Sequence, residues 1–222
     1  MGTATIRDSH IKLNGVKYFR GKAEDVDIGS YGRKRTPVFG MNYLDVYRNL
    51  PARKLDINEA VVVDIDFSNS TKADIEAGFS MAQVIGIQTG NVYEKLSSGE
   101  LKLVKFEMKI SDIEDAVNSN RRAFDYLVDE GDDARIAHQV FVVMEAELAS
   151  KVAASKTFDV KFSKGVYTIT AKGKVGSKTD TVVTLSEDST FAYLLLKPKW
   201  DAKRKRRIEE MTGGRTDQWS MG

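Results

Sequence analysis

The stretch from His138 to Phe162 constrains the fold of this chain most, because apolar and polar side chains alternate along nearly all of it. Successive side chains of a β-strand point to opposite faces, so this alternation is typical of a strand with one dry face and one wet face. We predict two strands here, His138–Ser150 and Ser155–Phe162, joined as a hairpin. Their dry face can rest on a protein core or, in a membrane, on lipid, and this choice decides the function.

Alternation of the same kind elsewhere predicts a sheet of many strands. The further strands that we expect are Glu59–Phe67, Lys72–Met81, Leu101–Ile110, Val166–Ala171, Thr181–Leu185 and Thr190–Leu196, the last ended by Pro198. The segment Lys72–Met81 also fits a short helix, because Ile75 and Phe79 are four residues apart. Its regular alternation favours a strand.

Turn and helix signals separate these strands. Asn14-Gly15 between alternating flanks predicts a hairpin with a type I′ turn, and the glycines and proline of residues 29–37 predict a loop. Short helices are expected at Met41–Leu50 and at the charged segment Asp201–Met211. A longer helix should start at Ser111, because Glu114 completes a capping box, and end near Gly131.

These elements together indicate an α+β fold: a twisted, mainly antiparallel, multi-stranded sheet with a few peripheral helices. Strict alternation of strand and helix does not occur, which argues against a doubly wound nucleotide-binding sheet. We expect a single domain over residues 1–199, followed at residues 200–222 by a short charged helix and tail.

The residue types available for chemistry make an enzyme the weakest functional class. The chain has no cysteine and two histidines, so we expect no thiolate nucleophile, no metal site and no cofactor. His138 opens a strand and is expected to be packed or solvated, not catalytic. The segment Gly173–Thr179 lacks the spacing of a phosphate-binding loop and is expected to be a hairpin turn.

Charge is nearly balanced, at a formal +2, but the basic residues cluster. Arg33-Lys34-Arg35 lies among aromatic and apolar residues, and Lys203–Arg207 places five cations together. Such clusters are solvated surface, or they bind anionic lipid or nucleic acid. Acidic strand faces and the balanced charge count against nucleic acid. The charged start of the chain and its lack of long apolar runs favour a cytoplasmic protein.

Several of these segments, taken in order, resemble the N-terminal pore-forming domain of the gasdermins, in particular the short-tailed bacterial ones. Val140–Ala146 and the alternation that follows it resemble the family's second membrane hairpin. Thr181–Tyr193 resembles its strand, polar turn and strand. The basic cluster Arg33-Lys34-Arg35, followed by Phe39 and Tyr43–Val46, resembles its basic-aromatic loop. The chain carries no large repressor domain after these segments and no cysteine for a lipid anchor, so it departs from the family in both respects.

The resemblance implies a pore-forming protein with a role in cell death or defence. Such a protein is cytoplasmic at rest, binds the anionic inner face of the cell membrane, forms a homo-oligomer and inserts two β-hairpins. The lipid-binding residues would be Arg33, Lys34, Arg35, Phe39, Lys203, Arg204, Lys205, Arg206 and Arg207. The apolar face of the two membrane hairpins would be Val61, Val63, Ile65, Phe67, Ile75, Phe79, Val142, Met144, Leu148, Phe158, Val160 and Phe162.

Two further expectations accompany this hypothesis. A protease that cuts the C-terminal tail would activate the protein, since Lys203–Arg207 is a cleavable basic run. In a pore, the polar residues Glu145, Glu147, Asp159 and Lys161 would line the lumen. The alternative function, from another class, is a non-enzymatic structural or interaction protein that self-assembles through β-strand edges without entering a membrane.

Overall fold

The computed structural model describes residues 2–51, 55–87, 89–163, 166–173, 180–185, 188–200 and 208–212. The strands are β1 Thr3–Ile6, β2 His10–Leu13, β3 Val16–Phe19, β4 Ser30–Arg35, β5 Tyr43–Asn49, β6 Ile57–Ile65, β7 Leu101–Met108, β8 Ala134–Glu145, β9 Phe158–Ser163, β10 Val166–Ala171, β11 Thr181–Leu185, β12 Thr190–Trp200 and β13 Ile208–Thr212. The helices are α1 Lys72–Glu76, α2 Val92–Ser98, α3 Ile110–Asn118, α4 Arg121–Glu130 and α5 Ala146–Ala153, with 3₁₀ turns at Ala23–Asp25, Met81–Gln83 and Gly131–Asp133.

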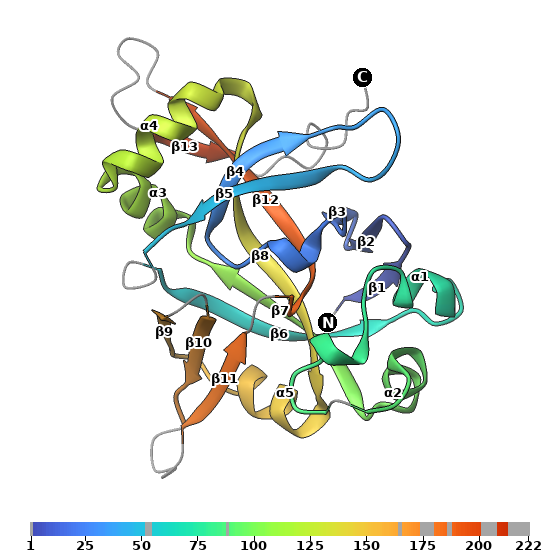
Figure 1. Cartoon of the computed structure of the whole chain (residues 1–222). Helices are drawn as coiled ribbons and strands as arrows, with labels where there is room; N and C mark the ends of the chain where they lie inside the picture. Colours follow the sequence, from blue (N-terminus) through green and yellow to red (C-terminus); the bar gives the residue numbers. More distant parts are fainter. Residues whose placement is uncertain are drawn as a thin grey trace.

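A ten-stranded sheet in the order β13-β12-β3-β2-β1-β6-β7-β8-β4-β5 organises the molecule, and a three-stranded sheet, β11-β10-β9, packs beside it (Figure 1). Nearly all pairs are antiparallel; β1 and β6 run parallel. Because β12 also pairs with β8, the strands from β12 through β3, β2, β1, β6 and β7 to β8 close into a ring. This large, twisted, mostly antiparallel sheet with few helices confirms the predicted α+β fold.

The central strand is β8, which pairs with three other strands, β4, β7 and β12. One of its edges pairs with β12 along most of the strand, from Ile136 to Val142. The other edge is shared, because β4 pairs with residues 134–136 and β7 with residues 139–145. β8 therefore joins the ring to the β4–β5 hairpin, which continues the sheet beyond it.

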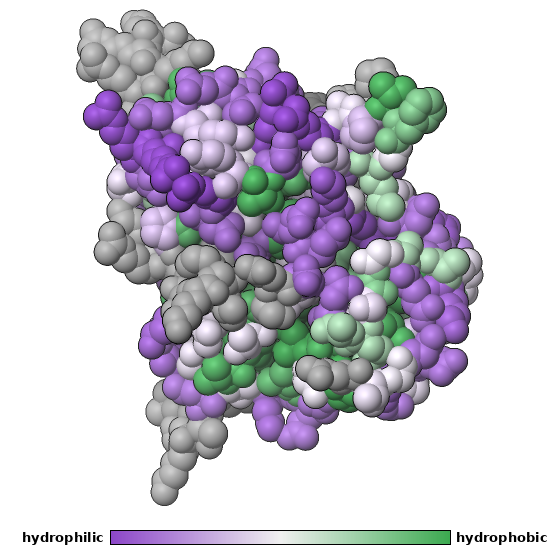
Figure 2. Space-filling view, in the orientation of Figure 1, coloured by the Kyte–Doolittle hydropathy of each residue, from purple (hydrophilic) through white to green (hydrophobic). Residues whose placement is uncertain are grey.

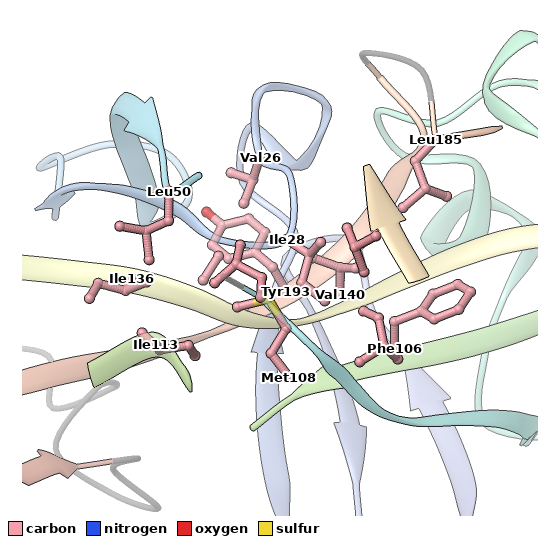
Figure 3. Close-up of a cluster of buried hydrophobic side chains, with 14 of the residues drawn as sticks. Val26, Ile28, Leu50, Phe106, Met108, Ile113, Ile136, Val140, Leu185 and Tyr193 are labelled. Atoms are coloured by element: carbon pink, nitrogen blue, oxygen red, sulfur yellow. The ribbon is translucent and has the colours of Figure 1, made fainter. Parts of the chain in front are cut away.

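Side chains of β8 fill two separate cores, one on each face of the strand. Val140, Val142 and Met144 belong to the core that also holds Tyr193 and Met108, part of which Figure 3 shows. Phe141 and Val143 belong to the second core. Each residue from Ala134 to Met144 is buried. The predicted wet face of this strand is therefore wrong, because both faces are covered by other elements.

The second half of the alternating stretch is a helix, not a strand. After β8, the carboxylate of Glu145 accepts hydrogen bonds from the backbone N–H groups of Glu147 and Leu148 and caps α5. Alanine, leucine, lysine and glutamate dominate α5, and these residues favour helix. β9 then pairs with β10 in the small sheet and not with β8. The predicted hairpin between His138 and Phe162 is therefore wrong in this structure.

The other proposed membrane hairpin is also a strand followed by a helix. β6 confirms the predicted strand at Glu59–Phe67, but Lys72–Glu76 is α1, the interpretation that the spacing of Ile75 and Phe79 had left open. The signal for the helix is a capping box: the Thr71 hydroxyl accepts from the Asp74 N–H, and the Asp74 carboxylate accepts from the Thr71 N–H. The capped N-terminus favours a helix here more strongly than the short alternating pattern favours a strand.

Several other predictions are settled by the structure. The Asn14-Gly15 hairpin is confirmed, with both turn residues at positive φ. Residues 30–35 and 43–49 form the β4–β5 hairpin, not a loop and a helix, and aromatic and β-branched residues such as Tyr43 and Val46 favour strand there. Ser111 lies inside α3 and does not cap it, and the expected long helix is split at Asn120, which caps α4.

The end of the chain also differs from the prediction. β12 runs through Pro198 to Trp200. Its pairing with β8 ends at Leu196, so Pro198 lies where β12 has β13 as its neighbour on one side, the kind of edge position where a sheet tolerates proline. Ile208–Thr212, expected to close a charged helix, is strand β13 and pairs with β12. The rest of that expected helix, residues 201–207, lies outside the described residues.

His138 lies at the irregular junction of β8 and β12, where the register shifts between Leu194 and Leu195. Its Nδ1 is 3.2 Å from the Leu194 carbonyl oxygen, and the ring is 3% exposed. His138 is therefore packed, one of the two environments expected for it. Burial lowers the pKa of His138 to about 4, while Glu107 opposes the shift and Lys105 adds to it.

We expect this histidine to make the protein acid-labile. The folded state favours neutral His138, whereas the unfolded chain binds the proton with a pKa near 6.5, so stability falls as pH drops from 6.5 to 4. The loss should reach about 3 kcal/mol in the free energy of unfolding. Guanidinium unfolding across this range measures it. A His138→Gln variant should lose much less unfolding free energy between pH 6.5 and 4. If its unfolding free energy fell with pH as steeply as that of the original protein, His138 would not be the cause of the acid lability.

Candidate functional site

The β4–β5 hairpin carries the most exposed apolar residues of the described chain. It projects from the body of the molecule, with residues 36–42 at its tip (Figure 1). Val38 is 92% exposed and Phe39 is 90% exposed at this tip, and Met41 beside them is 38% exposed. Figure 2 shows hydrophobic surface at the end of this projection. Exposed apolar residues that gather at one projecting point mark an interaction site.

The backbone holds the hairpin in a fixed shape up to Tyr43. Arg35 pairs with Tyr43 and Arg33 with Asp45, and a register irregularity follows at Gly32. A Cβ atom on Gly32 would collide with the Asp45 carbonyl, so the close approach of the two strands requires glycine here. The irregularity increases the local twist and carries the tip away from the body of the sheet.

Three tyrosines brace the base of the hairpin, and sequence reasoning did not identify them. The rings of Tyr47 and Tyr126 stack with centroids 4.0 Å apart, and Tyr31 meets both edge-on. Arg122 donates a hydrogen bond to the Tyr47 hydroxyl, which lowers the pKa of Tyr47. Tyr47 and Tyr126 are far apart in the sequence, so no local pattern could have paired them. The stack joins β5 to α4.

Two of the three basic residues on β4 are paired with acids. Arg33 lies 3.4 Å from carboxylate oxygens of both Glu130 and Asp133. Arg35 lies 2.9 Å from Asp45, and the hydrogen bond to that carboxylate raises the pKa of Arg35. Both arginines are more than two fifths exposed, so these pairs contribute little and can exchange with other anions.

Lys34 points to the opposite face of β4, as alternation requires. Burial lowers the pKa of Lys34, and the nearby cations Arg135 and Lys197 lower it further. The basic cluster of the sequence is therefore divided over two faces of one strand. The second predicted cluster, Lys203 to Arg207, lies outside the described residues.

The apolar positions predicted for membrane hairpins are distributed over five elements. They lie on β6 or directly after it (Val61, Val63, Ile65, Phe67), on α1 or after it (Ile75, Phe79), on β8 (Val142, Met144), on α5 (Leu148) and on β9 (Phe158, Val160, Phe162). Val63, Ile75, Phe79, Val142, Met144, Phe158 and Val160 are buried. Val61, Ile65, Phe67 and Leu148 are half-buried, and the Phe162 side chain is not among those described. In this state the seven buried positions form core, not membrane surface.

Nothing in the described part of the chain resembles a metal centre. No three histidine, aspartate or glutamate side chains there are placed to hold a metal ion. Within the same residues, no helix has the length and apolar character needed to cross a membrane.

Comparisons with protein-family models, with curated proteins and with solved structures find no match to this chain.

Proposed function

We propose that the protein binds anionic phospholipid membranes through the β4–β5 hairpin and permeabilises them as a gasdermin-like pore former. The observation that carries the proposal is the tip of this hairpin, where Val38 and Phe39 stand almost fully exposed beside a strand with three cations. A projecting apolar tip with a basic stem fits the boundary between lipid headgroups and acyl chains.

The expected energies are sufficient for reversible binding. Burying a valine or phenylalanine side chain contributes about 1.5–3 kcal/mol. Each cation near an anionic surface adds about 1 kcal/mol. Arg33 and Arg35 would exchange their exposed carboxylate partners for lipid phosphates at little cost. The tip and stem together therefore support recruitment to an anionic membrane without a lipid anchor.

Pore formation would require a change of secondary structure after binding. The segments after β6 and β8 would have to turn from α1 and α5 into strands, which their alternating sequences permit. Strands in hydrocarbon need every backbone group paired, so many copies of the chain would have to join edge to edge. A homo-oligomer on the inner face of the cell membrane, assembled from a cytoplasmic resting form, follows from this hypothesis.

The C-terminal segment is proposed as the restraint on this change. β13 pairs with β12, the strand that lies along β8, and the basic run Lys203–Arg207 precedes β13 in the sequence. A protease that cuts this run would detach β13 from its hairpin connection. Protein cut there should then leak vesicles faster than the intact chain.

Dye release from vesicles tests the proposal. Intact and cut protein are added to vesicles of phosphatidylcholine alone and of phosphatidylcholine mixed with phosphatidylglycerol. We expect release from the mixed vesicles, strongest with cut protein, and little from the neutral ones. No release by either form would refute pore formation, and vesicle co-sedimentation in the same samples shows whether membrane binding survives on its own.

A second candidate function is self-assembly through strand edges without membrane insertion. It is favoured by the terminal strands of the large sheet, β5 and β13, which each pair with one neighbour in the sheet order. Edges of this kind can template pairing with another copy. Sedimentation velocity without lipid distinguishes the two, since a scaffold should assemble there and a membrane-triggered pore former should not.

A further inference from the structure

The outer edge of β5, on the side away from β4, borders a polar slot of about 370 Å³. The slot is also lined by the turn that contains the 3₁₀ segment Ala23–Asp25 and by Asp188, whose backbone N–H donates to the Glu24 carbonyl at 3.1 Å. The β5 wall runs from Tyr43 to Asn49. This slot lies outside the exposed tip on which the proposed membrane binding depends.

The β5 wall presents backbone groups that a strand can pair with. The N–H of Leu44 points away from β4 and donates to the Tyr193 hydroxyl at 2.9 Å. In an antiparallel strand the N–H and C=O of alternate residues point to the same side. The next such residue is Val46, so its N–H and C=O are directed into the slot, where Val46 is a lining residue.

Both ends of the slot are fixed by hydrogen bonds. At one end Gly21 bridges Tyr43, and the Tyr193 hydroxyl donates to the Gly21 carbonyl at 2.8 Å. At the other end the Asn49 side-chain amide donates to Asp27 at 3.2 Å and accepts from the Ser30 hydroxyl at 2.6 Å. The slot is therefore pre-formed, and a ligand would not have to order it.

The slot is strongly acidic. Among the described residues, its lining includes Glu24, Asp25, Asp27, Asp45 and Asp188 and one basic residue, Lys22; Asp45 is already paired with Arg35. Lys22 lies over the Tyr43 ring, 4.4 Å from its centroid.

Several of these carboxylates have no cationic partner among the residues that the structure describes. Within the described part of the chain, Glu24, Asp25 and Asp188 take part in no ion pair. Burial raises the pKa of the Tyr193 hydroxyl behind the slot, and the charges of Glu24 and Asp25 raise it further. The negative potential thus reaches the wall of the slot, and a cation entering it would be attracted.

We infer that this slot binds a short, extended, basic segment of a partner protein, which adds as a strand to the outer edge of β5. Its main chain pairs with Val46, and lysine or arginine side chains reach Glu24, Asp25 and Asp188. Main-chain pairing supplies affinity in strand addition and side-chain pockets supply specificity. The same carboxylates repel phosphate, so an anionic lipid headgroup or a nucleic acid is a poor occupant.

Fluorescence anisotropy with labelled peptides tests this inference. The probe alternates lysine with threonine. One matched control has glutamate in place of lysine, and another is N-methylated at alternate residues, which keeps the charge and removes the N–H donors. We expect binding of the probe, at least about tenfold weaker binding of the N-methylated peptide and no binding of the glutamate peptide.

Variants of the exposed acids complete the test. The double variant Asp25→Asn/Asp188→Asn should weaken binding about tenfold. The matched control Glu94→Gln/Asp129→Asn, at exposed acids on α2 and α4, should bind as the unaltered protein does. Equal binding by the N-methylated peptide or by the slot variant would overturn the inference. So would a stable dimer in sedimentation that excludes the peptide, because the edge would then belong to a second copy. The assay contains no lipid, so its failure is independent of the membrane proposal.

Discussion

Replacing Val38 and Phe39 together with serine should reduce binding to anionic vesicles by a factor of about 100 or more. The two side chains are 92% and 90% exposed, so in the free protein they contribute almost nothing to the core. On a membrane each contributes about 1.5–3 kcal/mol of transfer free energy, which the serines would remove. The free energy of unfolding should stay within about 0.5 kcal/mol of the original, as for other surface substitutions. Vesicle co-sedimentation and guanidinium unfolding measure the two quantities.

The matched control is Val182→Ser. Val182 is an exposed valine on β11, 57% exposed and outside the β4–β5 hairpin. It should leave vesicle binding unchanged if the tip of the hairpin is the membrane contact. Equal losses from the two changes would mean that the protein binds vesicles by general apolar adsorption, and full binding by the tip variant would rule out the hairpin as the contact.

Replacing Arg20 with methionine should destabilise the fold by about 3–5 kcal/mol. The guanidinium of Arg20 donates to four backbone carbonyls, those of Arg7, Asp74, Ile75 and Ala77, and its Arg20–Phe191 contact places the charge over an aromatic ring at 4.3 Å. Burial lowers the pKa of Arg20 to about 10, so the group stays charged at neutral pH. Methionine preserves much of the volume but leaves those carbonyls without their donor.

The control for this prediction is Arg7→Met. Arg7 forms an exposed ion pair with Asp74, 3.5 Å long, and its loss should cost at most about 1 kcal/mol. Denaturant unfolding measures both variants. Hydrogen exchange should also show faster opening of α1 in the Arg20 variant, because three of the carbonyls that Arg20 binds lie in or just after that helix. A loss below about 1 kcal/mol in the free energy of unfolding for Arg20→Met would contradict the role of Arg20 in holding these backbone carbonyls.

Most strands could be predicted from the sequence because their side chains alternate. β6, β7, β10 and β11 start and end close to the predicted positions, and the Asn14-Gly15 turn is where the dipeptide placed it. These elements depend on neighbouring residues alone, because a two-residue period favours a strand and a dipeptide that accepts positive φ favours a hairpin turn. The same local reasoning identified Arg33 and Phe39, which do lie on one projecting hairpin.

Prediction failed where capping or strand pairing outweighed the periodicity or the length of a segment. Lys72–Met81 alternates, but Thr71 and Asp74 cap a helix there and Arg20 binds the carbonyls at its end. Met41–Leu50 has the length of a helix, but Tyr43 and Val46 pair with β4 instead. Periodicity within one segment reveals neither a cap at its start nor the strand that it pairs with.

The sequence by itself determined the α+β class and the strands whose side chains alternate, whereas the β4–β5 hairpin and its projecting tip appeared only in the structure. Tertiary structure alone decided what each face of a strand touches. Alternation in β8 suggested one wet face, yet Phe141 and Val143 fill one core while Val140 and Val142 fill another. Alternation with a period of two residues shows that the two faces of a strand differ. It does not show whether either face contacts water, because burial depends on elements that pack against the strand from elsewhere in the chain.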